Sequence, residues 1–153
     1  MCLILFSYNP NSNRPLVVAA NRDEVHARST AKARFWEDQP EILAGRDLVA
    51  NGTWLGCNRS GRFAALTNFS GDGDPLKPRS RGDLVRNFLS GKSDAEEYAG
   101  SIKSDEYAGF NLLLWDQANL IYTSNKAPTQ RLESGDYGLS NAELGASWPK
   151  CLE

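Results

Sequence analysis

The sequence is poor in the residues that build disulfide frameworks and metal sites. Its cysteines are Cys2, Cys57 and Cys151. Their number is odd and no two have Cys-x-x-Cys spacing, so neither a disulfide framework nor a zinc site is predicted. His26 is the only histidine, and no nucleophile-elbow motif accompanies it to indicate a Ser-His-Asp triad. We therefore expect no metal centre.

Long apolar runs are also missing. The longest are Met1–Phe6 and Leu16–Ala20, far shorter than the roughly 18 residues that indicate a membrane span. The N-terminus lacks the positively charged region and the longer apolar stretch of a secretory signal. These absences predict a protein with no membrane span and a cytoplasmic location.

Neither sign of charge is in large excess. Lys and Arg number 17 and Asp and Glu number 19, which gives a formal net charge of -2. This balance is unsuited to neutralising a phosphate backbone, so nucleic acid is not an expected partner. The expected partners are small molecules. A length of 153 residues with 41% hydrophobic content predicts a single globular domain with a substantial core.

Short apolar segments rich in strand-forming residues alternate with turns over much of the chain. Asn9–Pro15 is a dense turn cluster between two such segments, and Asn58–Gly61 connects two others, which predicts antiparallel hairpins. The predicted strands are Cys2–Tyr8, Leu16–Ala20, Ile42–Gly45, Thr53–Asn58, Arg62–Thr67, Asn111–Asp116, Leu120–Thr123 and Tyr137–Ser140.

The middle of the chain changes to a helical period. Apolar residues recur at helical spacing over 84–89 and again over 95–102. Ser80 and Ser93, each followed three residues later by an acidic residue, resemble the first members of capping pairs. Gly91 stands where the first helix would stop. Strands, then two helices, then strands favour an α+β layered sandwich over a parallel βαβ fold.

Cys2 is the first candidate for chemistry. If Met1 is removed, one residue carries both a thiol and a free α-amine, whose reference pKa of about 7.7 to 8.0 leaves part of it unprotonated near neutral pH. Such a residue can act as nucleophile and base together. The alternative is that a cysteine at the start of an apolar strand is a small buried hydrophobic residue.

The segment Asn21-Arg22-Asp23-Glu24 follows the second predicted strand directly. At the rim of a sheet, the Arg22 fork and the Asp23 carboxylate could orient an amine or neutralise charge on a thiolate or a substrate. The alternative is a solvated turn, which is common for charged clusters after strands.

Two asparagines at predicted strand ends are candidate oxyanion donors. Asn68 ends the strand that follows the segment Gly52-Thr-Trp-Leu-Gly56, whose glycines allow close backbone approach. Asn141 ends the last predicted strand and offers an amide donor in the same way. The alternatives are hairpin packing around Trp54 and a turn function for each asparagine.

A set of short segments runs in order across nearly the whole chain and is highly specific as a set. They are Met1–Phe6, Ala19–Glu24, Phe35–Asp38, Ile42–Asp47, Gly52–Gly56, Gly61–Asn68, Ser80–Gly82 and Leu139–Ala142. Together they resemble the NRDE family, also called the transport and Golgi organisation protein family.

The resemblance implies an αββα sandwich like that of N-terminal nucleophile hydrolases, with Cys2 in the nucleophile position. Family members are usually longer, so we expect residues 1–153 to form one domain that is incomplete at its C-terminus. In the penicillin V acylase and bile salt hydrolase group, the supporting arginine and aspartate are separated by two residues. Arg22 and Asp23 are adjacent here, so their roles are hypotheses.

Two functional hypotheses follow. In the first, Cys2 attacks an amide or ester, its α-amine takes the proton, Asn141 and Asn68 stabilise the oxyanion, and Asp23 with Arg22 orients the centre, with no cofactor. In the second, a non-catalytic protein binds and transports haem or another hydrophobic ligand, as the resemblance implies for some members. The sequence has no Cys-x-x-Cys-His motif, and no haem ligand is assigned.

Overall fold

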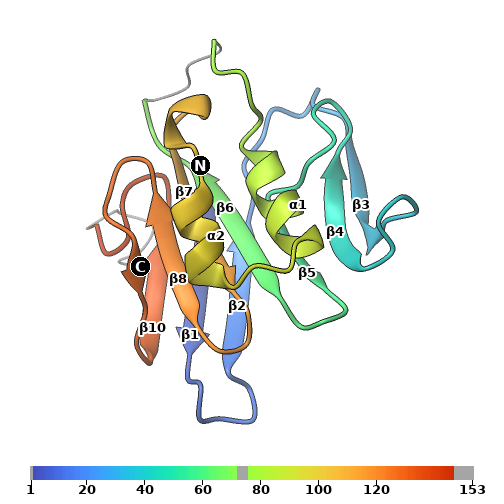
Figure 1. Ribbon diagram of the computed structural model, residues 1–153. Coiled ribbons are helices and arrows are strands. Elements are labelled where there is room, and N and C mark those ends of the chain that lie inside the picture. Colours follow the sequence, from blue (N-terminus) through green and yellow to red (C-terminus); the bar gives the residue numbers. More distant parts are fainter. Residues whose placement is uncertain (1, 72–75, 147–153) are drawn as a thin grey trace.

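Two antiparallel sheets, two α-helices and one short 3-10 helix make up the part of the chain that the structure, a computed structural model, describes: residues 2–71 and 76–146 (Figure 1). The smaller sheet has the order β10-β1-β2 and the larger has the order β3-β4-β5-β6-β7-β8-β9. The α-helices are α1 (Gly82–Ser90) and α2 (Ala95–Ser101), and a short 3-10 helix, η1 (Ser104–Glu106), follows them. The strands are β1 (Leu3–Tyr8), β2 (Leu16–Asn21), β3 (Thr30–Phe35), β4 (Ile42–Asp47), β5 (Leu55–Asn58), β6 (Phe63–Asn68), β7 (Phe110–Trp115), β8 (Leu120–Ser124), β9 (Gln130–Arg131) and β10 (Gly135–Leu139).

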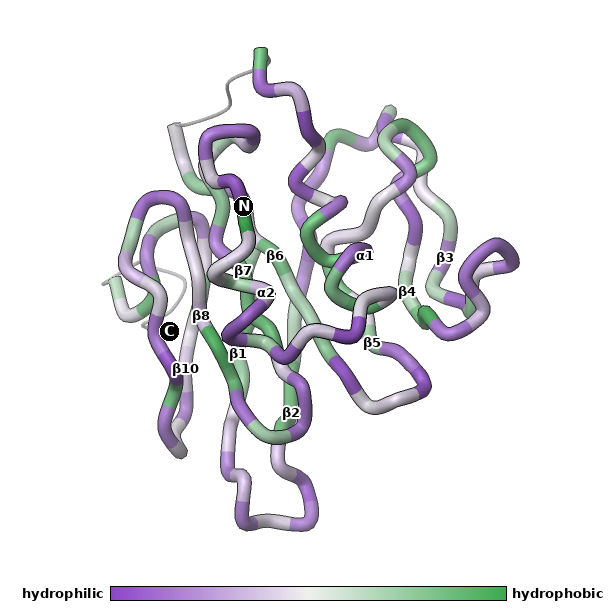
Figure 2. Tube along the Cα trace, viewed as in Figure 1, coloured by the Kyte–Doolittle hydropathy of each residue, from purple (hydrophilic) through white to green (hydrophobic). Residues whose placement is uncertain are grey.

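Alternating side chains of the larger sheet enter two different cores. On β7, Leu112 and Leu114 pack with the helices, whereas Leu113 packs with the smaller sheet, as expected when successive side chains point to opposite faces. The helices lie in front of the larger sheet and the smaller sheet lies behind it (Figure 1). Figure 2 shows hydrophobic positions along α1 and β8 and hydrophilic ones in the turn between β1 and β2. The described chain therefore forms three layers, helix, sheet and sheet.

The mixed α/β class with antiparallel sheets is confirmed by this architecture. Within the described ranges, no helix covers the outer face of the smaller sheet, where Leu5 is 44% and Val17 51% exposed. None of the described helices has the length and apolar character needed to cross a membrane.

Several predicted boundaries were wrong. The strand predicted from Thr53 starts at Leu55, because the backbone N–H of Thr53 donates to Gly82 of α1 rather than to a strand. The strand β3 was not predicted, since nearly all its residues are exposed and it has no alternating apolar face. The short strand β9 was also missed. The strand predicted to end at Gly45 continues to Asp47.

Both predicted capping pairs were also wrong, although both helices were confirmed. Arg81 occupies the N-cap of α1 and makes no side-chain cap hydrogen bond. Asp94, not Ser93, caps α2 by accepting a hydrogen bond from the backbone N–H of Glu97. Gly91 stops α1 as predicted, but its backbone is extended rather than left-handed.

A buried polar network fixes the backbone of Cys2 against the larger sheet. The Ser140 hydroxyl donates to the Cys2 carbonyl at 2.9 Å, and the Thr67 hydroxyl donates to the Ser140 carbonyl at 2.5 Å. The Asn111 amide donates to the Thr67 hydroxyl at 3.1 Å and accepts from the Tyr122 hydroxyl at 2.8 Å. Because unpaired buried polar groups are costly, this network holds the Cys2 backbone in a fixed position relative to both sheets.

Candidate functional site

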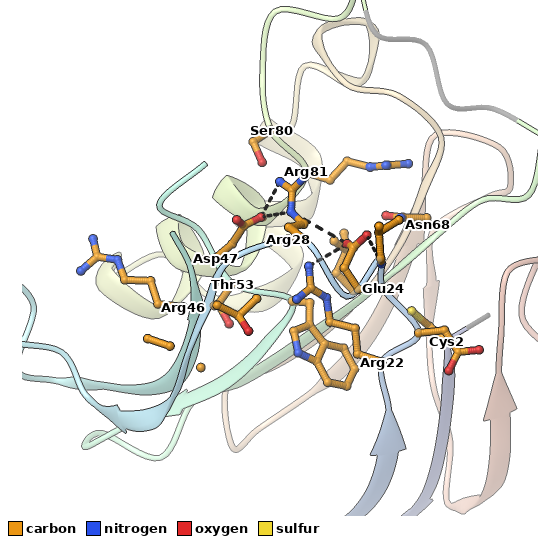
Figure 3. Close-up of a pocket in the computed structure, with 18 of the residues that line it drawn as sticks. Cys2, Arg22, Glu24, Arg28, Arg46, Asp47, Thr53, Asn68, Ser80 and Arg81 are labelled. Carbon is orange, nitrogen blue, oxygen red and sulfur yellow. Dashed lines mark hydrogen bonds and ion pairs between the residues drawn. The ribbon is translucent and has the colours of Figure 1, made fainter. Parts of the chain in front are cut away.

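A polar cavity of about 600 Å³ opens between the end of the smaller sheet, strands β4 and β6, and the start of α1. Figure 3 shows Cys2 at one side of it and Asp47 and Arg46 at the other. Four arginines and three carboxylate residues line it: Arg22, Arg28, Arg46, Arg81, Asp23, Glu24 and Asp47. Its size suits a small organic molecule.

Cys2 lies in the wall of this cavity and outside both apolar clusters. Its exposed fraction is 8%, yet it belongs to neither hydrophobic core. Leu3 pairs with Asn21, and Ile4 pairs with Leu139. Continuing these registers brings Arg22 to one side of Cys2 and Asn141 to the other. Met1 lies outside the described residues.

The charged segment after β2 lines the same cavity. Arg22 forms an ion pair with Glu24 at 2.9 Å, and the Asn21 amide donates to the Asp23 carboxylate at 3.1 Å. Arg22, Asp23 and Glu24 all line the cavity. This segment therefore forms one wall of the space that Cys2 also lines.

Asn68 and Asn141 lie next to each other but differ in their relation to the cavity. Asn68 is exposed and lines the cavity, whereas Asn141 is 8% exposed and lies behind it, donating to the Asn68 carbonyl at 2.7 Å. The Asn141 Oδ1 atom is buried and has no hydrogen-bond partner in the described chain. Of the five candidate residues, four line the cavity and the fifth supports its edge.

Arg28 and Asp47 were missed by the sequence reasoning. Both nitrogen contacts of Arg28 to the Asp47 carboxylate are short, 2.8 Å from Nε and 2.6 Å from Nη2. Arg28 also lies 3.9 Å from Glu24, so ion pairs run along the cavity wall (Figure 3). Asp47 belonged to a segment of the family resemblance, but nothing in the sequence paired it with a residue 19 positions away.

The ion pair between Arg28 and Asp47 shifts the pKa of both groups. The hydrogen bond to Asp47 raises the pKa of Arg28. Burial opposes ionisation of Asp47, but hydrogen bonds from Arg28 and from the backbone N–H groups of Val49 and Ala50 outweigh it and lower the pKa of that carboxyl. The charged forms of both residues are thus the stable ones in the folded protein.

Replacing Asp47 with Asn is expected to make the free energy of unfolding depend less on pH in the acidic range. Because the folded pKa is lowered, ionised Asp47 stabilises the fold above its unfolded pKa, and this contribution is lost as the pH falls through the folded pKa. We expect Asp47→Asn to lower the free energy of unfolding by about 1 kcal/mol at pH 7, and by progressively less as the pH falls below the ordinary Asp pKa of about 3.9. Urea unfolding at several pH values measures this, with the exposed Asp136→Asn as control. An equal loss at both ends of the range would contradict it.

Two glycines allow close approach near the cavity, Gly52 to the start of α1 and Gly56 to β4. A Cβ atom on Gly52 would lie 2.6 Å from the backbone carbon of Gly82, closer than real atoms approach. A Cβ atom on Gly56 would lie 2.8 Å from that of Ala44. The close backbone approach predicted for Gly52 and Gly56 is therefore confirmed, and it places Ser80 and Gly82 in the cavity wall.

The described residues offer few groups that bind metal ions. In residues 2–71 and 76–146, no group of three or more His, Cys, Asp or Glu side chains could hold a metal ion. His26 lines the cavity and is exposed. Four arginines and three carboxylate residues make the lining a polar surface for any ligand.

Taken together, stacked antiparallel sheets, helices on one outer face and a charged cavity beside Cys2 define a mixed α/β protein with a candidate small-molecule site. The family described as Transport and Golgi organisation 2 matches residues 1–153. The chain belongs to this family, and the resemblance to NRDE proteins is confirmed.

Curated relatives support the same assignment. The chain is 37% identical over 167 residues to the Transport and Golgi organization protein 2 homolog of Homo sapiens, covering 98% of this chain and 60% of that protein. It is 36% identical to the Mus musculus homolog with the same coverage. To the Drosophila melanogaster protein it is 30% identical over 165 residues, covering 93% of this chain and 58% of that protein. The chain thus spans about 60% of the length of the mammalian relatives.

Proposed function

We propose that the protein is a hydrolase in which Cys2, after removal of Met1, cleaves an amide or ester bond in a small molecule. The observation that carries this proposal is the placement of Cys2. Its backbone is pinned by Ser140, and it lies outside both apolar cores in the wall of a cavity that it shares with Arg22 and Asp23.

The proposed reaction has two balanced steps. The Cys2 sulfur bonds to the substrate carbonyl carbon while its proton passes to the α-amine. The tetrahedral oxyanion then collapses, the C–N or C–O bond breaks, and the ammonium protonates the leaving amine or alcohol. Water next adds to the thioester and gives its proton to the same amine. Release of the acid returns that proton to sulfur and restores Cys2.

The supporting roles follow from position. The Asn68 side chain lines the cavity and is the proposed oxyanion donor. Asn141 does not line the cavity but donates to the Asn68 carbonyl, so it is proposed to hold Asn68 in place for that role. Arg22 and Asp23 are the proposed orienting pair for the α-amine. The Oδ1 atom of Asn141, which lacks a partner in the described chain, is a further acceptor for that amine.

The layer arrangement is compatible with an αββα sandwich of the N-terminal nucleophile hydrolase type. The helix, sheet and sheet layers account for three of its four layers. We propose that the second helical layer, in the longer relatives, packs on the exposed face of the smaller sheet that carries Leu5 and Val17.

A carrier of haem or another hydrophobic ligand is the weaker proposal, because the described lining includes four arginines and three carboxylate residues. It would require an apolar ligand to lie against Arg22, Glu24 and Arg28, which are engaged with one another. Spectral titration of the Cys2→Ala variant with haemin tests it, since an unchanged, saturable shift would favour the carrier over the hydrolase.

Removal of Met1 is the critical requirement of the hydrolase proposal. We expect intact mass measurement of active protein to show a chain that starts at Cys2. A matched variant with one glycine inserted between Met1 and Cys2 keeps the thiol but ties its nitrogen into a peptide bond. It should hydrolyse 4-nitrophenyl acetate at least about 100-fold more slowly, because it lacks the general base. Full activity in that variant, or in protein that retains Met1, would overturn the proposal.

A further inference from the structure

A chain of ion pairs links the Cys2 side of the cavity to the larger sheet. Residues 22–29 connect β2 of the smaller sheet to β3 of the larger one. Within this connection, Arg22 contacts Glu24 at 2.9 Å and Glu24 lies 3.9 Å from Arg28. Arg28 then contacts Asp47, at the end of β4, at 2.6 Å. The four side chains alternate in charge and all line the cavity (Figure 3).

Asp47 is the rigid end of this chain. Its Oδ1 atom accepts from the backbone N–H groups of Val49 at 2.9 Å and Ala50 at 3.4 Å, while its Oδ2 atom accepts from Arg28. The side chain is 14% exposed. The backbone N–H of Leu48 also donates to the Ser29 carbonyl at 3.0 Å. The connection is therefore attached to the end of β4 by both side chain and backbone.

We propose that Asp47 and Arg28 are positioning residues for the Cys2 site. The two residues fix the position of Glu24, and Glu24 fixes Arg22 by their ion pair. Asp23, which lies between Glu24 and Arg22 in the sequence, is fixed with them. The inference rests on the proposed function, since it assigns these residues to the same site. Neither Asp47 nor Arg28 has to touch the substrate. Their role is to keep the segment Arg22–Glu24 in one conformation against the cavity.

The physical reason lies in competition for Glu24. Its side chain is only 33% exposed, and it is shared by Arg22 and Arg28. When Arg28 has its own carboxylate in Asp47, Glu24 remains available to Arg22. Without the Asp47 charge, Arg28 turns to Glu24 and displaces Arg22, because close opposite charges attract most strongly where water is partly excluded.

The neighbouring ion pair between Arg46 and Asp38 supplies a matched control. Arg46 precedes Asp47 on β4 and contacts Asp38 at 2.5 and 2.8 Å. Asp38 does not line the Cys2 cavity, and its ion pair is with Arg46 rather than with any of the four residues from Arg22 to Asp47 that form the series of ion pairs. Arg46 itself lines the cavity and keeps its positive charge there when Asp38 is replaced. Asp38→Asn therefore removes a similar bidentate pair from the same hairpin and leaves the ion pairs from Asp47 to Arg22 intact.

The test compares alkylation of Cys2 by iodoacetate and iodoacetamide, with Cys57 as the internal reference. A positively charged side chain held in the cavity favours the anionic reagent. We expect the iodoacetate-to-iodoacetamide rate ratio at Cys2 to fall about fivefold in Arg22→Gln and about threefold in Asp47→Asn. In Asp47→Asn, the displacement of Arg22 near Cys2 outweighs the loss of a negative charge on the far side of the cavity. Asp38→Asn should leave the ratio unchanged. The Arg22→Gln/Asp47→Asn double variant should match Arg22→Gln alone, since Asp47 acts through Arg22.

Hydrogen exchange provides the second readout and separates the two proposals. The Arg28 amide, which donates to the Val25 carbonyl, and the Leu48 amide, which donates to the Ser29 carbonyl, should exchange about tenfold faster in Asp47→Asn than in Asp38→Asn, with exchange in β7 unchanged. An unchanged ratio and unchanged exchange, or fully additive effects on the ratio, would overturn the positioning role. If Cys2 in the parent protein reacts with neither reagent, the proposed hydrolase function fails, and the exchange rates alone decide the positioning role.

Discussion

Replacing Cys2 with Ala is expected to reduce 4-nitrophenyl acetate hydrolysis to background, a loss of at least about 1,000-fold. The thiol is the only group at the cavity wall proposed to form a covalent intermediate, and neither Asn68 nor Arg22 can substitute for it. The acetylated intermediate should be detectable on the Cys2 peptide of the parent protein after acid quenching. Intact mass and peptide mapping measure both outcomes on the same sample.

The matched control is Cys57→Ala. Cys57 lies on β5, is partly exposed, and is not among the residues that line the cavity. Its replacement should leave hydrolysis within about twofold of the parent, since a surface-accessible change away from special features has small effects. Equal losses in the two variants, or hydrolysis retained by Cys2→Ala, would show that the chemistry does not depend on Cys2.

The parts of the fold that could be predicted are those whose side chains repeat with a clear period. Strand β1 alternates buried and exposed residues, and α1 places Leu84, Val85, Phe88 and Leu89 in the core as its spacing predicted. Strand β3 has no such period, because it lies at an edge of the larger sheet and most of its residues are exposed. Burial creates the periodic signal, so a strand without a buried face leaves none.

The residue types of the candidate site could be predicted from the sequence, but the ion pairs between its residues could not. The candidates Cys2, Arg22 and Asp23 come from strand ends that the sequence marks clearly, and the structure lines one cavity with them. The pairing of Arg28 with Asp47 depends on how the connection after β2 crosses to β4, which no local pattern encodes. The burial of Asn141 behind Asn68 depends likewise on contact between the ends of β6 and β10.

Replacing Gly52 with Ala is expected to destabilise the protein by about 3 kcal/mol. The added Cβ would lie 2.6, 2.8 and 2.9 Å from three backbone atoms of Gly82, none of which can rotate away. Relief requires the start of α1 to move, which breaks the contact between the Thr53 N–H and the Gly82 carbonyl. For a chain of this length, the midpoint of thermal unfolding should fall by about 10 °C.

Gly100→Ala distinguishes this backbone clash from a general intolerance of alanine. Gly100 lies in α2, is exposed, and a Cβ there would meet nothing within 4 Å, so the substitution should stabilise the helix by up to about 1 kcal/mol. Because Ser80 and Gly82 form part of the cavity wall, Gly52→Ala should also change the alkylation rate of Cys2, whereas Gly100→Ala should not. A Gly52→Ala protein with unchanged thermal midpoint would mean that α1 and the segment before β5 do not approach as closely as the structure shows.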